Sequence, residues 1–303
     1  MGKSNLRYFF AGVLSFAIWG FFSIPLRNLK AFPSQEILYY RIFTSMVFLW
    51  VAILVFRKKQ IRKDLDYLAG LKRKEKQTIG FQLVASTVLL TSNWYTYIYA
   101  VNNVSLQSAA FAYMVCPLIT AFGGFILLKE HLSRLKLISL GIALLSIILL
   151  ATGSFVEVMW SVAIASLYAF YLIIQRKMKH LDKLNVLATQ IGMAVLMMLP
   201  FYFFEHGNIP DSTWFWGNIT VVAVLFTIIP LFLSLYALIG IPSSTLGIII
   251  YTNPIIAFTV AILYFNEQVD SNKLLAYLLL LTSVIVFNWS ILKDILTFKK
   301  KNI

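Results

Sequence analysis

Residues 115–132, VCPLITAFGGFILLKEHL, and residues 252–269, TNPIIAFTVAILYFNEQV, align without a gap at a separation of 137 positions. In each stretch a proline precedes a glutamate by thirteen residues. The two pairs are Pro117 with Glu130 and Pro254 with Glu267. The chain therefore contains one hydrophobic segment twice.

The repetition extends upstream of the prolines. NWYTYIYAV at 93–101 lies over PLFLSLYAL at 230–238 at the same separation of 137 positions. Two copies of a module built from several membrane-length segments are typical of secondary transporters, whose halves face each other across a central site.

Composition indicates an integral membrane protein, because 60% of the 303 residues are apolar and only 13% are charged. A helix needs about 20 residues to cross the hydrocarbon core. Runs such as LISLGIALLSIILLA stay apolar throughout, which excludes the alternating pattern of a closed β-barrel. We expect an all-α fold with ten transmembrane helices, at 8–26, 37–56, 80–100, 105–128, 135–152, 157–174, 185–204, 218–239, 243–265 and 273–292.

The distribution of lysine and arginine predicts the orientation. With the N-terminus inside, 22 of the 26 basic residues lie on the cytoplasmic side, nine of them in a solvated linker at 57–76. The positive-inside rule then places both termini in the cytoplasm of a multi-pass plasma (inner) membrane protein. Because five helices per copy is an odd number, the second repeat, 157–292, is inverted relative to the first, 8–152.

The strings NWYTYIYAVNN at 93–103 and IPSSTLGIIIYTNPIIAF at 241–258, with the repeated proline-to-glutamate spacing, resemble the RarD-like branch of the EamA permeases in the drug/metabolite transporter superfamily. The resemblance spans essentially the whole chain. It implies a ten-helix carrier with a central cavity formed by helices 1, 3, 4, 6, 8 and 9. The family usually carries Asn-Pro in helix 4 and Gly-Glu at its end. This chain departs from that pattern with Cys116–Pro117 and Lys129–Glu130, and keeps it at Asn253–Pro254.

Arg41 is the one charged residue placed well inside an expected membrane helix. Two roles are open to it: its side chain reaches the nearby interface or pairs with another group, or it binds the carboxylate of a solute bidentately. All twelve carboxylates fall in loops or at helix ends. A central acid of the kind that exchanges protons for lipophilic cations is missing, so the sequence favours neutral, zwitterionic or anionic solutes.

Polar and aromatic side chains on the cavity helices are the candidate lining. Asn93 lies in mid-helix and must find a partner, either another helix or the solute. Pro117 and Pro254 each free a backbone carbonyl four residues earlier and are candidate kinks or gates. The lining candidates besides Arg41 are Trp19, Asn93, Trp94, Tyr97, Tyr113, Tyr168, Ser234, Tyr251 and Asn253.

No enzyme motif is present. His131, His180 and His206 fall in separate loops and do not form a metal site, and the phosphate-binding loop of ATPases is missing. We expect no cofactor and no catalytic residue. The net charge of +14 reflects the orientation of the chain in the membrane and does not indicate nucleic-acid binding. The expected partners are a small-molecule substrate and the lipid bilayer, without nucleic acid or a partner protein.

Together these features predict a permease for small organic solutes, with amino-acid-like or anionic metabolites as leading cargo and alternating access as the mechanism. Drug or antibiotic efflux is the alternative within transport, and the missing central acid disfavours it. A lipid scramblase or a membrane-embedded lipid-modifying enzyme is the alternative from another class. A scramblase should show a polar stripe open to lipid along one helix, and such an enzyme should show clustered His, Asp or Glu at one interface. Neither pattern is visible.

Overall fold

The computed structural model describes residues 3–29, 31–103, 106–150, 155–178, 180–205, 209–264, 271–287, 289 and 293. Glu267 and His206 lie outside these residues. The described residues form α-helices and one π-helix, with no β-strand among them. In chain order the helices are α1 (Lys3–Gly20), α2 (Ser23–Asn28), α3 (Ser34–Phe56), α4 (Lys58–Gly70), α5 (Arg73–Asn103), α6 (Leu106–Leu128), α7 (Arg134–Leu150), α8 (Phe155–Lys177), α9 (Lys183–Glu205), α10 (Thr213–Ala223), the π-helix η1 (Val224–Ile228), α11 (Ile229–Gly240), α12 (Ser243–Ile249), α13 (Thr252–Leu263) and α14 (Ser271–Phe287).

Each of the ten apolar stretches expected from the sequence falls on one or more of these helices, wherever the structure describes it. Within the described residues, five helical spans are long and apolar enough to cross a membrane. They are Leu6–Leu26, Gln35–Phe56, Met159–Lys177, Lys183–Phe204 and Thr213–Gly240. Shorter apolar helices cover Ala112–Leu128 and Ser243–Ala257. The fold is therefore that of a multi-pass helical membrane protein, and the full set of ten crossings stays a prediction.

The stretch expected as helix 9 is broken between α12 and α13. Pro254 has no N–H to offer the carbonyl of Ile250, four residues earlier. The N–H of Asn253 donates to that carbonyl instead, at 2.9 Å, in a tighter turn. The break sets Tyr251 at the junction of the two helices. Pro117, by contrast, lies inside the unbroken helix α6.

The stretch expected as helix 8 changes pitch in its middle, where α10 passes through the π-helix η1 into α11. Pro230 lies at the start of α11 and removes the N–H that would bond to the carbonyl of Phe226. The hydroxyl of Thr227 donates to the carbonyl of Val222 at 3.0 Å, within the same distorted segment. A π-turn of this kind frequently marks a functional region of a helix.

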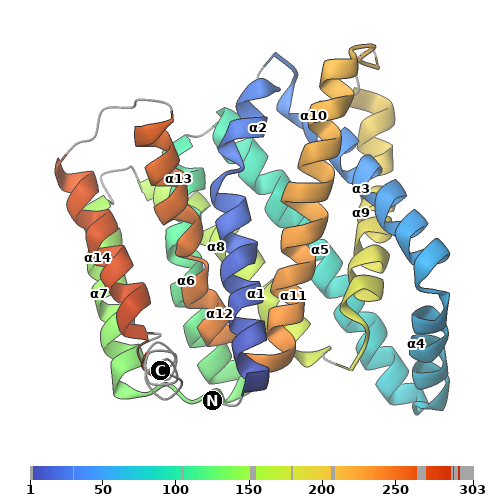
Figure 1. Cartoon of the computed structure of the whole chain (residues 1–303), viewed down its shortest axis with the longest axis horizontal. Helices are drawn as coiled ribbons and strands as arrows, with labels where there is room; N and C mark the ends of the chain where they lie inside the picture. Colours follow the sequence, from blue (N-terminus) through green and yellow to red (C-terminus); the bar gives the residue numbers. More distant parts are fainter. Residues whose placement is uncertain are drawn as a thin grey trace, which may run out of the picture.

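The helices run side by side in one bundle (Figure 1). At one edge α14 packs against α7, and at the other α3 packs against α9. Between these edges α6 contacts α8 and α12, α5 contacts α8, and α1 contacts α11. Helix α4 lies at one end of the bundle and α2 at the opposite end (Figure 1). We call these the α4 end and the α2 end.

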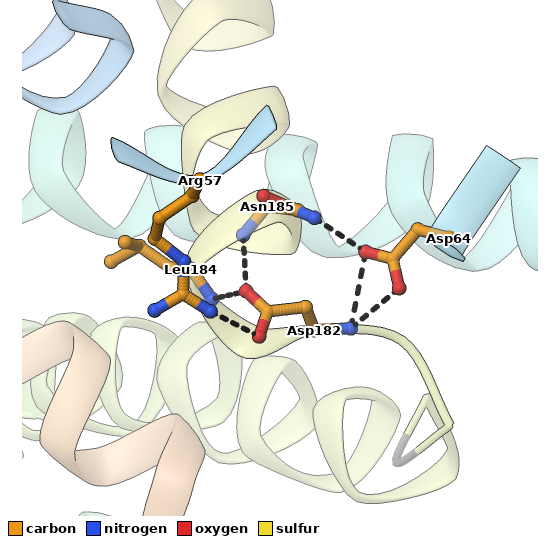
Figure 2. A network of polar contacts seen from close by, with 5 residues as sticks. All are labelled: Arg57, Asp64, Asp182, Leu184 and Asn185. Atoms are coloured by element: carbon orange, nitrogen blue, oxygen red, sulfur yellow. Dashed lines mark hydrogen bonds and ion pairs between the residues drawn. The ribbon is translucent and has the colours of Figure 1, made fainter. Parts of the chain in front are cut away.

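The basic segment expected to be a solvated linker contains helix α4, none of whose residues is buried. A polar network ties α4 to the start of α9 (Figure 2). Arg57 donates to the carboxylate of Asp182 at 2.7 Å, and Asp64 accepts from the side-chain amide of Asn185 at 2.6 Å and from the N–H of Asp182. Asp182 in turn accepts from the N–H groups of Leu184 and Asn185, which caps α9.

Candidate functional site

Arg41 on α3 lies among aromatic side chains from two other helices. Its guanidinium carbon is 5.2 Å from the ring centroid of Trp94 on α5. The phenols of Tyr97 on α5 and Tyr113 on α6 are its electrostatic neighbours. Their rings meet edge to face with centroids 5.5 Å apart. The chain thus gathers Arg41 and three of the predicted lining residues at one place.

The guanidinium of Arg41 is incompletely satisfied. Its Nε is buried and has no hydrogen-bond partner. Among the described residues no carboxylate forms an ion pair with Arg41. The face of Trp94 offers a cation–π contact, but a ring has no acceptor atom to fill the five-donor fork of an arginine. An anion with two adjacent oxygens has the geometry to do so.

A second aromatic group continues from this cluster into α8. The rings of Tyr168 and Tyr171 stack with centroids 5.7 Å apart, and Trp19 meets Tyr168 edge-on at 6.2 Å. Tyr113 is an electrostatic neighbour of Tyr168, which connects the two groups. The hydroxyls of Tyr168 and Tyr171 are buried, and neither has a partner at ordinary hydrogen-bond geometry, although Ser234 lies near the first and Gln175 near the second.

Trp19 also makes a hydrogen bond to the backbone of another helix. Its indole N–H donates to the carbonyl of Phe226 at 2.8 Å. That carbonyl is the one left free by Pro230, so Trp19 satisfies a backbone group that the proline orphaned. Ser15, one turn earlier on α1, donates to the carbonyl of Pro230 itself at 2.7 Å. The α1–α11 contact is therefore held by side-chain donors directed at the distorted segment.

Asn93 and Ser234 make bonds within the helix bundle. The amide of Asn93, which is 2% exposed, donates to the carbonyl of Ile164 on α8 at 2.9 Å. Of the two partners open to it, another helix or the solute, the structure contains the first. The hydroxyl of Ser234 is likewise buried and donates to the carbonyl of Leu231 at 2.8 Å.

The two proline segments come together where α6 crosses α12. A Cβ placed on Gly247 would lie 2.9 Å from the Cβ of Thr120 and 3.3 Å from the carbonyl oxygen of Pro117. A larger residue has no space there, so the glycine permits the close approach of the two helices. Tyr251, two residues after α12 ends, is buried and its hydroxyl has no partner. Asn253 is half-buried and Pro254 is buried.

Within the residues that the structure describes, no group of three His, Cys, Asp or Glu side chains converges as a metal site. The sequence profile of the EamA-like transporter family matches residues 6–152 and again residues 156–289. The chain belongs to this family. It is a membrane transporter of the drug/metabolite superfamily.

Relatives of this EamA-family chain carry transporter names. An uncharacterized transporter of Pseudomonas aeruginosa is 29% identical over 95% of this chain and 96% of its own length. The protein RarD of Streptomyces exfoliatus is 26% identical, covering 96% of this chain and 90% of that protein, and the RarD of Escherichia coli is 25% identical over 90% of each. One solved structure, titled only as a crystal structure of a protein, matches with a TM-score of 0.72 at 12% identity, over 92% of this chain and 95% of that one. The last likeness shows a shared fold.

Glu130 caps a distant helix in this EamA-family chain, a role that the sequence did not predict. Its carboxylate accepts from the N–H and the hydroxyl of Ser243 and from the N–H of Ser244, at 2.7–2.8 Å. Ser243 begins α12 as expected, but the residue that caps this helix comes from the end of α6. The signal in the sequence was a glutamate at a fixed distance from each proline, and its partner, 113 positions away, was not evident.

The departure from the family pattern at Lys129 has a backbone consequence. Lys129 has φ of 54°, and it is the one non-glycine residue with positive φ in the described chain. Glycine adopts this left-handed conformation without steric cost, which explains why Gly-Glu is usual here. The turn at Lys129 directs the following Glu130 toward α12.

Proposed function

We propose that this transporter moves small solutes that bear a carboxylate or a similar anionic group, amino-acid-like zwitterions among them, and that Arg41 binds the anionic end. The observation that carries the proposal is a guanidinium over the ring of Trp94 with a buried, unpartnered Nε. A charge held inside a membrane protein is costly unless it is paired or used. A carboxylate from the solute completes the pairing that the chain itself leaves open.

The surroundings of the site favour an anion over a lipophilic cation. Tyr97 and Tyr113 bring neutral phenols, which donate hydrogen bonds to oxygen atoms, and no Asp or Glu is an electrostatic neighbour of Arg41 in the part of the chain with described side chains. A cation would meet the positive charge of Arg41 with no acid to offset it. Drug efflux by exchange of a cation for a proton lacks its acidic residue here.

We propose that the two halves, 8–152 and 157–292, are inverted repeats that rock about this site. The two stretches matched by the family profile support this division. Two residues 137 positions apart each contact the first helix of the opposite half: the side chain of Asn93 donates to α8, whereas the backbone carbonyl of Pro230 accepts from α1. Ser139 on α7 and Ser283 on α14 each donate to the carbonyl of the other, at 2.8 and 2.9 Å. These bonds join the last helix of one proposed half to the last helix of the other.

The orientation follows from charge. We place the α4 end in the cytoplasm, because residues 57–76, which contain α4 and the start of α5, hold nine lysines and arginines. Both termini then face the cytoplasm, and the chain resides in the plasma (inner) membrane. Arg41, seven residues into α3 from the α2 end, lies in the outer half of the membrane.

The test is replacement of Arg41 by Gln in purified protein reconstituted into liposomes. We expect counterflow of carboxylate-bearing solutes to fall about tenfold or more, since a charge-assisted bidentate contact is lost. Counterflow of the corresponding amides should change little. Arg41→Lys, which keeps the charge but not the planar fork, should give an intermediate rate. Equal loss for acids and amides would assign Arg41 to structure and overturn the proposal.

A further inference from the structure

One face of α8 carries buried polar atoms that have no partner. Tyr168, Tyr171 and Gln175 are 4%, 0% and 0% exposed. None of the two phenol oxygens and the two polar atoms of the Gln175 amide has a partner at ordinary hydrogen-bond geometry. Gln175 does lie near Tyr171, and Ser234 near Tyr168, but neither pair reaches that geometry. Spacings of three and four residues put the three side chains on the same side of the helix. We call this set the α8 stripe.

Gln175 differs from the other unsatisfied amides in the part of the chain that the structure describes, because neither end of its amide is bonded, whereas Asn185 and Gln190 each leave only the carbonyl oxygen without a partner. Ser139 and Ser283 satisfy each other, Asn93 reaches a carbonyl, and Gln190 donates to Ser86 at 2.6 Å. A primary amide with neither its N–H₂ nor its carbonyl paired is among the most costly neutral groups to bury. Such a group is retained where another state of the protein, or a bound molecule, supplies the missing partners.

The α8 stripe begins at the aromatic group beside Tyr113 and runs toward the α4 end. Directly after Gln175, Arg176 donates to the carbonyl of Leu238 on α11. Glu130, which caps α12, is an electrostatic neighbour of Arg176. These contacts join α6, α8, α11 and α12 at the α4 end. The unpartnered atoms of the stripe therefore lie just behind the contacts that close that end.

We propose that Tyr171 and Gln175 line the half of the solute path that leads from the central site to the α4 end. When the contacts of Glu130 and Arg176 separate, water and the passing solute supply the hydrogen bonds that these side chains lack here. Neutral donors and acceptors suit this position, because they bind a carboxylate or an ammonium group weakly and so let the solute leave the Arg41 site. The inference rests on the proposed transport function. It adds the residues that line the solute path between the central site and the α4 end.

The first test compares Gln175→Met and Tyr171→Phe, which remove the polar atoms at similar volume. A residue that serves only structure should lower the melting temperature when replaced. Because these atoms have no partner to lose, we expect the melting temperature to stay constant or rise while counterflow per folded molecule falls about tenfold. The matched control is Ser139→Ala, whose hydroxyl is fully bonded: it should lower the melting temperature and leave counterflow per folded molecule unchanged. Unchanged counterflow in both α8 variants, or a fall in melting temperature, would overturn the inference.

The second test measures access. The native Cys116 is buried, so Cys116→Ala gives a background for a single cysteine at Gln175→Cys. We expect a membrane-impermeant thiol reagent to label this cysteine from the α4 end, and faster when Glu130→Ala removes the cap of α12. Absence of labelling in both backgrounds would contradict a path at this position. Labelling without carboxylate counterflow would overturn the proposed cargo and leave the path in place.

Discussion

At the scale of single residues, Lys129 and Trp19 show local backbone features that amino-acid propensities do not predict. Lys129 holds a left-handed backbone conformation that costs a non-glycine residue about 1–2 kcal/mol. Trp19 bonds a carbonyl exposed by a proline on another helix. Trp19 holds backbone geometry beside Tyr168, and Lys129 sets the turn before Glu130 at the α4 end.

Lys129→Gly should raise the free energy of unfolding by about 1 kcal/mol, because glycine relieves the strain at φ 54° with little loss elsewhere. Thermal unfolding of the purified protein in detergent measures it. Lys129→Ala is the matched control: it removes the same exposed side chain but keeps a Cβ, so it should not stabilise. A fall in stability for the glycine variant would mean that the lysine side chain itself makes a needed contact.

Trp19→Phe keeps an aromatic ring but removes the indole N–H that bonds the carbonyl of Phe226. An unsatisfied carbonyl inside the bundle should cost about 1–3 kcal/mol of stability. Trp214→Phe provides the comparison, because Trp214 is 64% exposed. Equal melting temperatures for the two variants would show that the bond to Phe226 contributes nothing to stability.

At the scale of elements, α4 is docked by polar contacts rather than by burial. Asp64 accepts from both the side chain of Asn185 and the backbone of Asp182 (Figure 2), and Leu68 packs with Met178, Leu181 and Val186 in a small apolar cluster. A charged, solvated helix would otherwise be free of the bundle. The network therefore determines where the basic segment lies.

Asp64→Ala should release α4 from the start of α9, because two contacts disappear with one carboxylate. Limited trypsin digestion at Lys58–Lys63 should become roughly fivefold faster, which corresponds to about 1 kcal/mol of docking free energy. Asp66→Ala removes an exposed carboxylate from the same helix and should not change the digestion rate. If both variants are cut at the same rate as the unmodified protein, the network does not hold α4.

The elements that could be predicted from sequence are those encoded locally. The apolar stretches fall on helices because membrane length and hydrophobicity are properties of consecutive residues. The π-helix at Val224–Ile228 and the cap of α12 by Glu130 were not predicted, since each depends on a donor or acceptor from a distant helix. The sequence predicted that Arg41, Trp94, Tyr97 and Tyr113 line the cavity. It did not predict that these four side chains lie together. Their mutual distances, and the unpartnered Gln175, required the packed bundle.

At the scale of the whole molecule, three features follow one another along the proposed route. Arg41 and its aromatic neighbours lie in the half toward the α2 end, the α8 stripe follows, and Glu130 and Arg176 close the α4 end. A carrier that alternates between two openings needs a central site with a closure that can separate on either side. The polar atoms left without partners mark the part of the route that is shut.

We propose above that the chain carries small carboxylate-bearing solutes. The most direct measurement is counterflow into liposomes that hold the purified protein and are preloaded with amino acids and small organic acids, with and without a proton gradient. We predict exchange of these solutes at a rate that the gradient does not change, because we expect no central acid to couple it. Failure of these solutes to exchange, with lipophilic cations moving under a pH gradient instead, would contradict the account.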